Sequence, residues 1–220
     1  MRFDAVLFDC DGVLVDSEPI TNGVLHGMLN AQGWNLSAQD CFSMFVGHAL
    51  IDHAALIEQR TGRQVTAQWI DDFRARRDAA LSEHLEAVAH IHEAVDTLHA
   101  ATHKRIACAS GADRGKIALQ LTKVKLLHYF EDRIFSGMEH ARNKPHPDVY
   151  LTAAQFLGAD PRCCAVVEDT VNGARAGLAA GATVFGYVGT SAVAGQTAAL
   201  RALGVHHVFS DMRELPGLMA

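Results

Sequence analysis

The chain has 220 residues, of which 49% are hydrophobic and 20% are charged, with a formal net charge of −6. A chain of this size and composition can bury a core of its own, as one domain or as one domain with an insertion. The negative charge argues against a general nucleic-acid or membrane-surface binder, but not against a small anion, because local charge governs that binding.

The cysteines and the apolar stretches indicate the compartment. The five cysteines show no paired metal-ligand spacing, and at least four lie in apolar or strand-like segments, which is typical of buried thiols in a reducing compartment. Acidic residues, Asp4 and Asp9, flank the first apolar run, which is unlike a signal peptide. The longest stretch of small apolar residues, 176–188, contains three glycines and is too short to cross a bilayer. We therefore expect a soluble, cytoplasmic protein.

Short apolar runs alternate with helical patterns along most of the chain. Strands are predicted at 5–8, 105–109, 133–135, 165–167 and 183–187, with a short sixth at 207–209. Helices are predicted at 113–122, 148–157 and 171–180, and Gly158 and Gly181 stand where helices would end. This alternation is typical of βαβ units. It predicts an α/β protein with a Rossmann-like core built on a parallel sheet.

The alternation is interrupted once, between the first two predicted strands. About ninety residues separate them, far more than a crossover requires. Apolar residues recur at helical spacing from Ile20 to Leu29 and from Leu50 to Ile57, and a third helix is predicted from 67 to about 85. We expect an all-helical cap domain at 17–87, inserted into a core formed by 1–16 and 88–220. An insertion joined at two points beside a site is suited to act as a lid.

Polar residues follow the carboxyl ends of four predicted strands. They are Asp9 with Asp11, Ser110–Gly111, Lys144, and Glu168–Asp169. Residues i and i+2 of a strand face the same side, so the first two acids can converge. Each group alone has an ordinary alternative: a turn or helix cap, a solvated loop, or a carboxylate at a helix dipole. All four at one sheet edge favour a common site, because open α/β sheets bind ligands there.

Together these groups have the chemistry of phosphoryl transfer. Carboxylates can hold Mg²⁺, a hard cation that prefers oxygen ligands. The metal and a lysine can neutralise phosphate oxygens while bonds change. One aspartate can act as a nucleophile and form an aspartyl-phosphate. Its neighbour two positions on can serve as general acid and then as general base for water.

The same residues resemble the motifs of haloacid dehalogenase superfamily phosphatases. The matching stretches are 8–18, Ser110, 144–148 and 167–174, in family order across most of the chain. The likeness is to the subgroup with a helical cap after the first strand, which includes β-phosphoglucomutase and phosphoglycolate phosphatase. A narrower likeness, over 127–137, is to bacterial 6-phosphogluconate phosphatases. The family fold is a Rossmann-like core with a mobile cap.

The resemblance implies a role for each acid of the matching motifs. Asp9 would be the nucleophile and a Mg²⁺ ligand. Asp11 would be the acid/base, and its backbone carbonyl would also bind Mg²⁺. Asp169 would bind the metal directly, and Glu168 would bind it directly or through water.

The remaining positions would bind phosphate or substrate. Ser110–Gly111 and Lys144 would hold the phosphoryl group, and Gly12 would let the backbone approach it closely. Gly47, in a turn between predicted cap helices, suggests a loop that reaches toward the site. His48 in that loop is a candidate substrate contact, with an exposed loop residue as the alternative.

Single positions distinguish the reactions known in this family. Asp11 favours cleavage of an O–P bond, because dehalogenases and phosphonate-cleaving members lack an acid there. The mutase type carries a histidine early in the cap and an arginine in the cap loop. This chain has Thr21 and Leu50 at those positions, and His26 or His48 could replace them only in a shifted register.

We therefore predict a Mg²⁺-dependent phosphatase that hydrolyses a small phosphorylated metabolite, a sugar or sugar-acid phosphate, through an aspartyl-phosphate. The alternative within the family is a β-phosphoglucomutase-like phosphosugar mutase. An alternative from another class is a phospho-receiver or binding module that uses Asp9 only as a phosphate acceptor. The expected partner is the small phosphorylated substrate, with no nucleic acid and no membrane. The expected state is a monomer.

Overall fold

The structure is a computed structural model that describes residues 2–46 and 50–220. The chain divides into two compact units, one formed by residues up to 16 together with 86–220, and the other by 17–85. We call them the sheet unit and the helical unit. The predicted boundary at 87/88 differs from the observed division by two residues.

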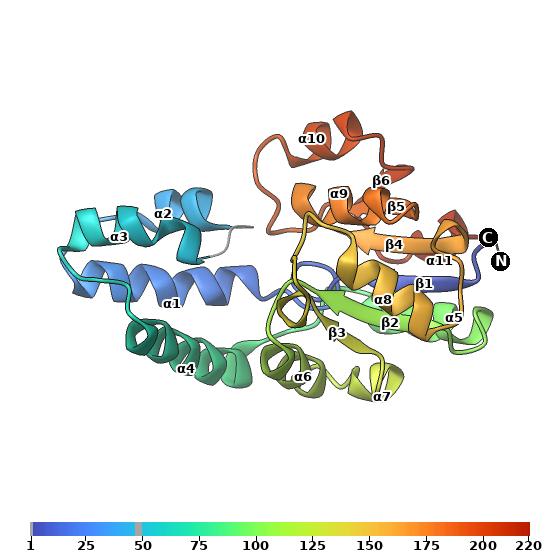
Figure 1. The fold of residues 1–220 in the computed structure, drawn as a ribbon, viewed down its shortest axis with the longest axis horizontal. Helices are drawn as coiled ribbons and strands as arrows, with labels where there is room; N and C mark the ends of the chain where they lie inside the picture. Colours follow the sequence, from blue (N-terminus) through green and yellow to red (C-terminus); the bar gives the residue numbers. More distant parts are fainter. Residues whose placement is uncertain (1, 47–49) are drawn as a thin grey trace. The chain divides into compact units, whose positions relative to one another are not determined.

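A parallel sheet of six strands forms the centre of the sheet unit (Figure 1), in the order β3-β2-β1-β4-β5-β6. The strands are β1 (Ala5–Phe8), β2 (Ile106–Ser110), β3 (Ile134–Ser136), β4 (Cys164–Glu168), β5 (Thr183–Tyr187) and β6 (His207–Phe209). The bounds of β1, β5 and β6 are those predicted, and the bounds of β2, β3 and β4 differ from the prediction by one residue at each end. The predicted Rossmann-like α/β core is confirmed.

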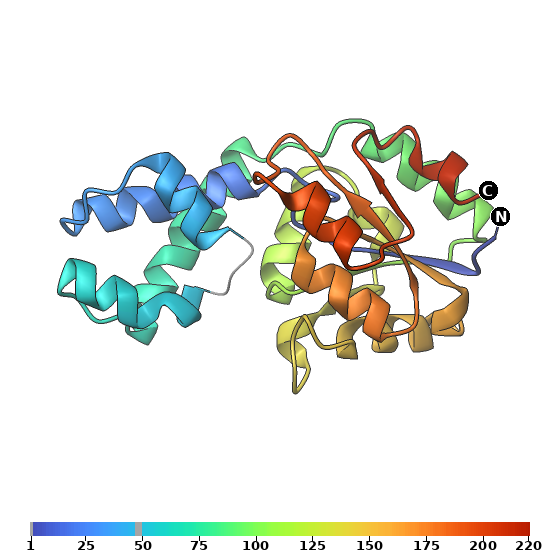
Figure 2. The ribbon, with the colours of Figure 1, turned by 90° about the horizontal axis from the view of Figure 1, so that it is seen from above.

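Helices cover both faces of this sheet. They are α5 (Ile91–Ala101), α6 (Arg114–Lys123), α7 (Leu127–Phe130), α8 (Asp148–Phe156), α9 (Val171–Ala179), α10 (Gln196–Ala202) and α11 (Leu215–Leu218), with 3-10 turns η2 (Gly137–Glu139) and η3 (Pro161–Cys163). Figure 2 shows α5 and α11 on one side of the sheet and α8 and α9 on the other. Alternate strand residues such as Leu7 and Val166 pack against α8 and α9 in one buried cluster. Because both faces are covered, the inner strands are almost entirely apolar.

The helical unit contains α1 (Glu18–Ala31), α2 (Ala38–Phe45), η1 (Leu50–His53), α3 (Ala54–Thr61) and α4 (Ala67–His84). It has a hydrophobic cluster of its own, which includes Leu29, Trp34, Phe45 and Ile57. Gly47 and His48, predicted to contact substrate, lie outside the described residues. Within the described part of the chain, no single helix has both the length and the apolar character that a membrane crossing needs.

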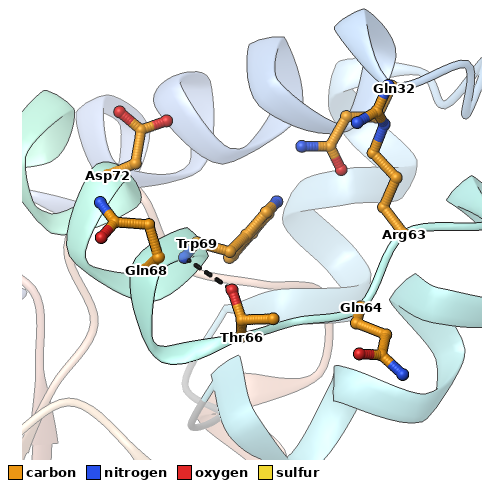
Figure 3. Close-up of a pocket in the computed structure, with 7 residues that line it drawn as sticks. All are labelled: Gln32, Arg63, Gln64, Thr66, Gln68, Trp69 and Asp72. Carbon is orange, nitrogen blue, oxygen red and sulfur yellow. Dashed lines mark hydrogen bonds between the residues drawn. The ribbon is translucent and has the colours of Figure 1, made fainter.

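The helical unit carries an open pocket, shown in Figure 3. It is lined by Gln32, Arg63, Gln64, Thr66, Gln68, Trp69 and Asp72. Asp72 is the single carboxylate among these lining residues, and it forms an ion pair with Arg76 at 3.1 Å. A single carboxylate does not make a metal site, so this pocket is not the candidate active site. The candidate active site lies at the edge of the sheet, where three acids meet.

Candidate active site

Three acids meet where the strand order reverses. The chain builds β1, β2 and β3 in one direction and then returns to add β4 on the other side of β1. The gap outside the carboxyl ends of β1 and β4 is the position at which such sheets bind ligands. Asp9 follows β1, Glu168 ends β4, and Asp169 comes next. One carboxylate oxygen from each of the three lies within 4.8 Å of the other two.

Lys144 reaches this acidic group from the loop after β3. Its Nζ lies 2.9 Å from Asp9 Oδ1 and 2.7 Å from Glu168 Oε1, and it donates to the carbonyl of Ala109 at 2.9 Å. Burial lowers the pKa of Lys144, but the charges of Asp9 and Glu168 outweigh this effect and hold the pKa well above its usual value. The positive charge of Lys144 is therefore favoured by the two acids that it contacts.

Glu168 has no exposed surface, and each of its oxygens accepts two hydrogen bonds. Oε1 accepts from Lys144 and from the Tyr150 hydroxyl at 2.8 Å. Oε2 accepts from the backbone N–H and the hydroxyl of Thr170, at 3.1 and 3.0 Å. A buried carboxylate persists only when its charge is compensated in this way. The network keeps Glu168, and through it Lys144, in one position.

Asp9 is buried beside these charges. Burial and the negative charge of Glu168 raise the pKa of Asp9 to about 7, although Lys144 opposes the shift. Its Oδ1 accepts the N–H of Cys10 at 2.8 Å as well as contacting Lys144. The carboxylate is thus held in a fixed orientation, and a cation next to it would favour its charged form.

Asp11 lies close enough for its charge to add to the rise in the pKa of Asp9, but its carboxylate is bound to partners on α6. Its two oxygens lie 2.8 and 2.9 Å from Lys116 Nζ, and Oδ1 also accepts from Gln120 Nε2 at 2.7 Å. The i, i+2 rule holds only within a strand, and β1 ends at Phe8. The backbone then turns, with Leu14 N–H donating to the Cys10 carbonyl at 2.9 Å.

The sequence reasoning missed Lys116 and Gln120, the two partners of Asp11 on α6. Both are buried. Cys10 Sγ donates to Gln120 Oε1 at 3.3 Å and so orients its amide toward Asp11. A lysine in the first turn of a helix is disfavoured by the helix dipole. Lys116 stands three residues after the cap Asp113, behind the strand that ends in Ser110. This unfavourable placement of a lysine is the feature of the sequence that could have indicated a role for Lys116 at the site.

The predicted phosphate-binding residues lie at the same sheet edge. Ser110 ends β2 and is 2% exposed, and its Oγ accepts the N–H of Ala112 at 3.2 Å. Gly12 has φ of +75°, and a Cβ there would lie 2.1 Å from Asp169 Oδ2. Position 12 therefore requires glycine because its backbone lies close to the Asp169 carboxylate.

The acidic group fits a hard divalent cation. The donors of Asp9, Glu168 and Asp169 are all carboxylate oxygens, which Mg²⁺ prefers. Lys144 is the cation that contacts two of these acids. Three carboxylates beside one lysine leave a negative balance that a bound divalent ion would offset.

The family follows from comparison with known proteins. Residues 3–181 match the model of the haloacid dehalogenase-like hydrolases. The chain is 33% identical to 6-phosphogluconate phosphatase of Escherichia coli over 84% of this chain and 82% of that protein. The chain belongs to the haloacid dehalogenase-like hydrolase family. The predicted family and enzyme class, a phosphomonoester hydrolase of the haloacid dehalogenase type, are confirmed.

Solved structures agree over the whole length. A haloacid dehalogenase-like protein of unknown function from Agrobacterium tumefaciens is 30% identical, with a TM-score of 0.86 over 99% of this chain and 97% of that one. A hydrolase of the family from Deinococcus radiodurans, solved with bound phosphate and sodium, is 35% identical, with a TM-score of 0.79 over 97% of this chain and 93% of that one. The likeness therefore includes both units of the chain.

Proposed function

We propose that this chain is a Mg²⁺-dependent phosphatase that hydrolyses a sugar or sugar-acid phosphate through an aspartyl-phosphate on Asp9. The observation that carries the proposal is the contact of Asp9 with Lys144, inside a group of three carboxylates at the switch point of the sheet. The relative named 6-phosphogluconate phosphatase supports the substrate class. The Deinococcus relative with bound phosphate supports an anion site in this fold.

In the first half of the reaction, an Asp9 oxygen attacks phosphorus and the bond to the leaving alcohol breaks. Lys144 stabilises the negative charge of the phosphoryl oxygens. Asp11 gives its proton to the leaving oxygen. In this structure the Asp11 carboxyl is bound to Lys116 and Gln120. To protonate the leaving oxygen, it must either move away from these partners or act on a substrate that binds next to them.

In the second half, Asp11 takes a proton from water, whose oxygen attacks phosphorus, and the bond to Asp9 breaks to release inorganic phosphate. Asp9 and Asp169 would hold Mg²⁺, with Glu168 directly or through water and the Asp11 carbonyl as further ligands. When bound, the metal supplies positive charge to the phosphoryl oxygens.

We assign substrate selection to residues 17–85, as a helical cap. Gly47 and His48, which stand between α2 and η1 in the sequence, are proposed as substrate contacts. We also propose that the protein acts as a monomer in the cytoplasm. The free cysteines, four of them buried, agree with a reducing compartment.

The test is phosphate release from a panel of sugar phosphates, 6-phosphogluconate and phosphoglycolate, with Mg²⁺ or EDTA. Asp9→Asn should lower kcat by roughly 10³-fold or more, because the nucleophile is removed. Asp4→Asn is the matched control, since Asp4 is exposed just before β1, and it should match wild type. Circular dichroism should show that both variants are folded.

Two results would contradict the proposal. One is the absence of phosphate release from every phosphomonoester with Mg²⁺ present. The other is isomerisation of β-glucose 1-phosphate stimulated by a bisphosphate, which would establish the mutase instead.

A further inference from the structure

Asn143 contacts both of the groups that are proposed to hold phosphate. Its Nδ2 donates to the carbonyl of Gly111 at 2.9 Å, and its Oδ1 accepts the N–H of Lys144 at 2.8 Å. A flipped amide would face donor with donor and acceptor with acceptor, so only one orientation satisfies both contacts. Asn143 therefore links the loop after β2 to the loop that carries Lys144.

The space for this amide is provided by a glycine. A Cβ on Gly137 would lie 1.9 Å from Asn143 Oδ1, far inside contact distance. Gly137 is not among the glycines with positive φ. Its need for glycine is therefore steric rather than conformational. A side chain at position 137 would displace the amide from its two backbone partners.

The contact with Gly111 also orients the Ser110 hydroxyl. The Gly111 carbonyl and the Ala112 N–H belong to one planar trans peptide unit and point in opposite directions. With the carbonyl held by Asn143, the N–H is directed at Ser110 Oγ, 3.2 Å away. Ser136 holds the next carbonyl, that of Ala112, at 2.6 Å. Because Ser110 Oγ accepts this bond, the hydroxyl has its own proton to donate to a phosphate oxygen.

At its other end, the amide fixes the backbone of Lys144. From there the side chain extends to the Ala109 carbonyl and to Asp9. We propose that Asn143 is a positioning residue that sets the relative placement of Ser110 and Lys144 for binding the phosphoryl group. The inference rests on the proposed function, because it takes these two residues as the phosphate-holding groups.

The test compares Asn143→Ala and Gly137→Ala with Asn30→Ala. Asn30 makes the same kind of amide clamp, with Nδ2 donating to the Leu36 carbonyl at 3.2 Å and Oδ1 accepting the Leu36 N–H at 3.0 Å. It lies in the helical unit and contacts no phosphate-holding residue. All three variants are assayed for kcat/KM, for the inhibition constant of inorganic phosphate, and for melting temperature.

For Asn143→Ala and Gly137→Ala, we expect kcat/KM to fall roughly 10- to 100-fold and phosphate inhibition to weaken about tenfold, since small misplacements of binding groups have effects of this size. Asn30→Ala should lower the melting temperature while leaving phosphate inhibition within about twofold of wild type. Such a split cannot arise from loss of stability alone. If Asn143→Ala does not fold, Gly137→Ala carries the comparison.

The inference is overturned if phosphate inhibition of the folded Asn143 or Gly137 variant stays within about twofold of wild type, or if Asn30→Ala weakens it equally. A wild-type protein that releases no phosphate would defeat the proposed function instead. In that case calorimetric titration with inorganic phosphate compares the same variants and still decides the role of Asn143.

Discussion

At the scale of single residues, the packing around Glu168 is the tightest constraint on the site. A Cβ on Gly173, in the first turn of α9, would lie 1.7 Å from Glu168 Oε1. The carboxylate could not stay in place against that atom, and its bonds to Lys144, Tyr150 and Thr170 would have to change. Breaking one partner of a buried charge network costs several kcal/mol.

Gly173→Ala should therefore reduce activity severely and lower the melting temperature. Gly27→Ala is the matched control, because Gly27 also lies in a helix, α1, and a Cβ there meets nothing within 4 Å. Alanine is the better helix former, so Gly27→Ala should raise stability by roughly 0.5–1 kcal/mol with activity unchanged. Thermal melts and phosphate-release assays check both. Equal effects of the two substitutions would contradict the steric role of Gly173.

The sequence predicted the acids and Lys144 because each stands directly at a strand end or in the loop beyond one, and strand ends of a parallel sheet share an edge. It could not predict Tyr150 or Asn143. Tyr150 occupies a buried position on α8, and its pattern is that of a core aromatic. Its contact with Glu168 depends on how α8 packs across the sheet, which local sequence does not encode.

At the scale of elements, α6 carries both partners of Asp11 and depends on its first turn. Asp113 caps this helix, accepting the N–H of Lys116 at 2.8 Å. Thr66 caps α4 in the same way, accepting the N–H of Trp69 at 3.2 Å, as the dashed line in Figure 3 shows. The two caps are chemically alike, but only the first bonds to a residue that holds Asp11.

Asp113→Ala and Thr66→Ala should each cost about 1 kcal/mol of stability, the usual value for a lost helix cap. Only Asp113→Ala should also lower kcat, because loosening the first turn of α6 releases Lys116 from its backbone position. Melting curves and steady-state kinetics of the two variants provide the comparison. Unchanged kcat in Asp113→Ala would show that the placement of Lys116 does not depend on the cap.

The elements differ in how far the sequence could predict them. The strands and α8, α9 and α4 were found nearly at their bounds. Helix α5 was missed although its buried residues, Ile91, Ala94, Val95 and Leu98, follow helical spacing. Helices α2 and α10 were also missed, and they span only eight and seven residues. Runs of that length contain about two helical turns, which is too short for periodicity to distinguish helix from loop.

At the scale of the whole molecule, the two connections to the helical unit lie side by side within the sheet unit. The N–H of Asp16 donates to the Glu86 carbonyl at 3.1 Å, and that of Val88 to the Leu14 carbonyl at 3.2 Å. Val15 and Ala87 form an antiparallel bridge. The chain therefore leaves the sheet unit and returns to it at almost one point, and each unit has its own hydrophobic cluster.

We expect that residues 17–85 can be replaced by a short Gly-Ser linker joining Asp16 to Glu86, because the bonded ends need little added chain. The shortened protein should fold, bind inorganic phosphate, and lose discrimination among phosphate esters.

The matched control deletes only α4, residues 67–84. Although it removes fewer residues, it exposes the apolar face of α1 that packs on α4, so it should be less stable and prone to aggregate. Circular dichroism, melting curves and calorimetry with phosphate distinguish the two. A full replacement that unfolds while the α4 deletion remains stable would show that the sheet unit is not an independent folding unit.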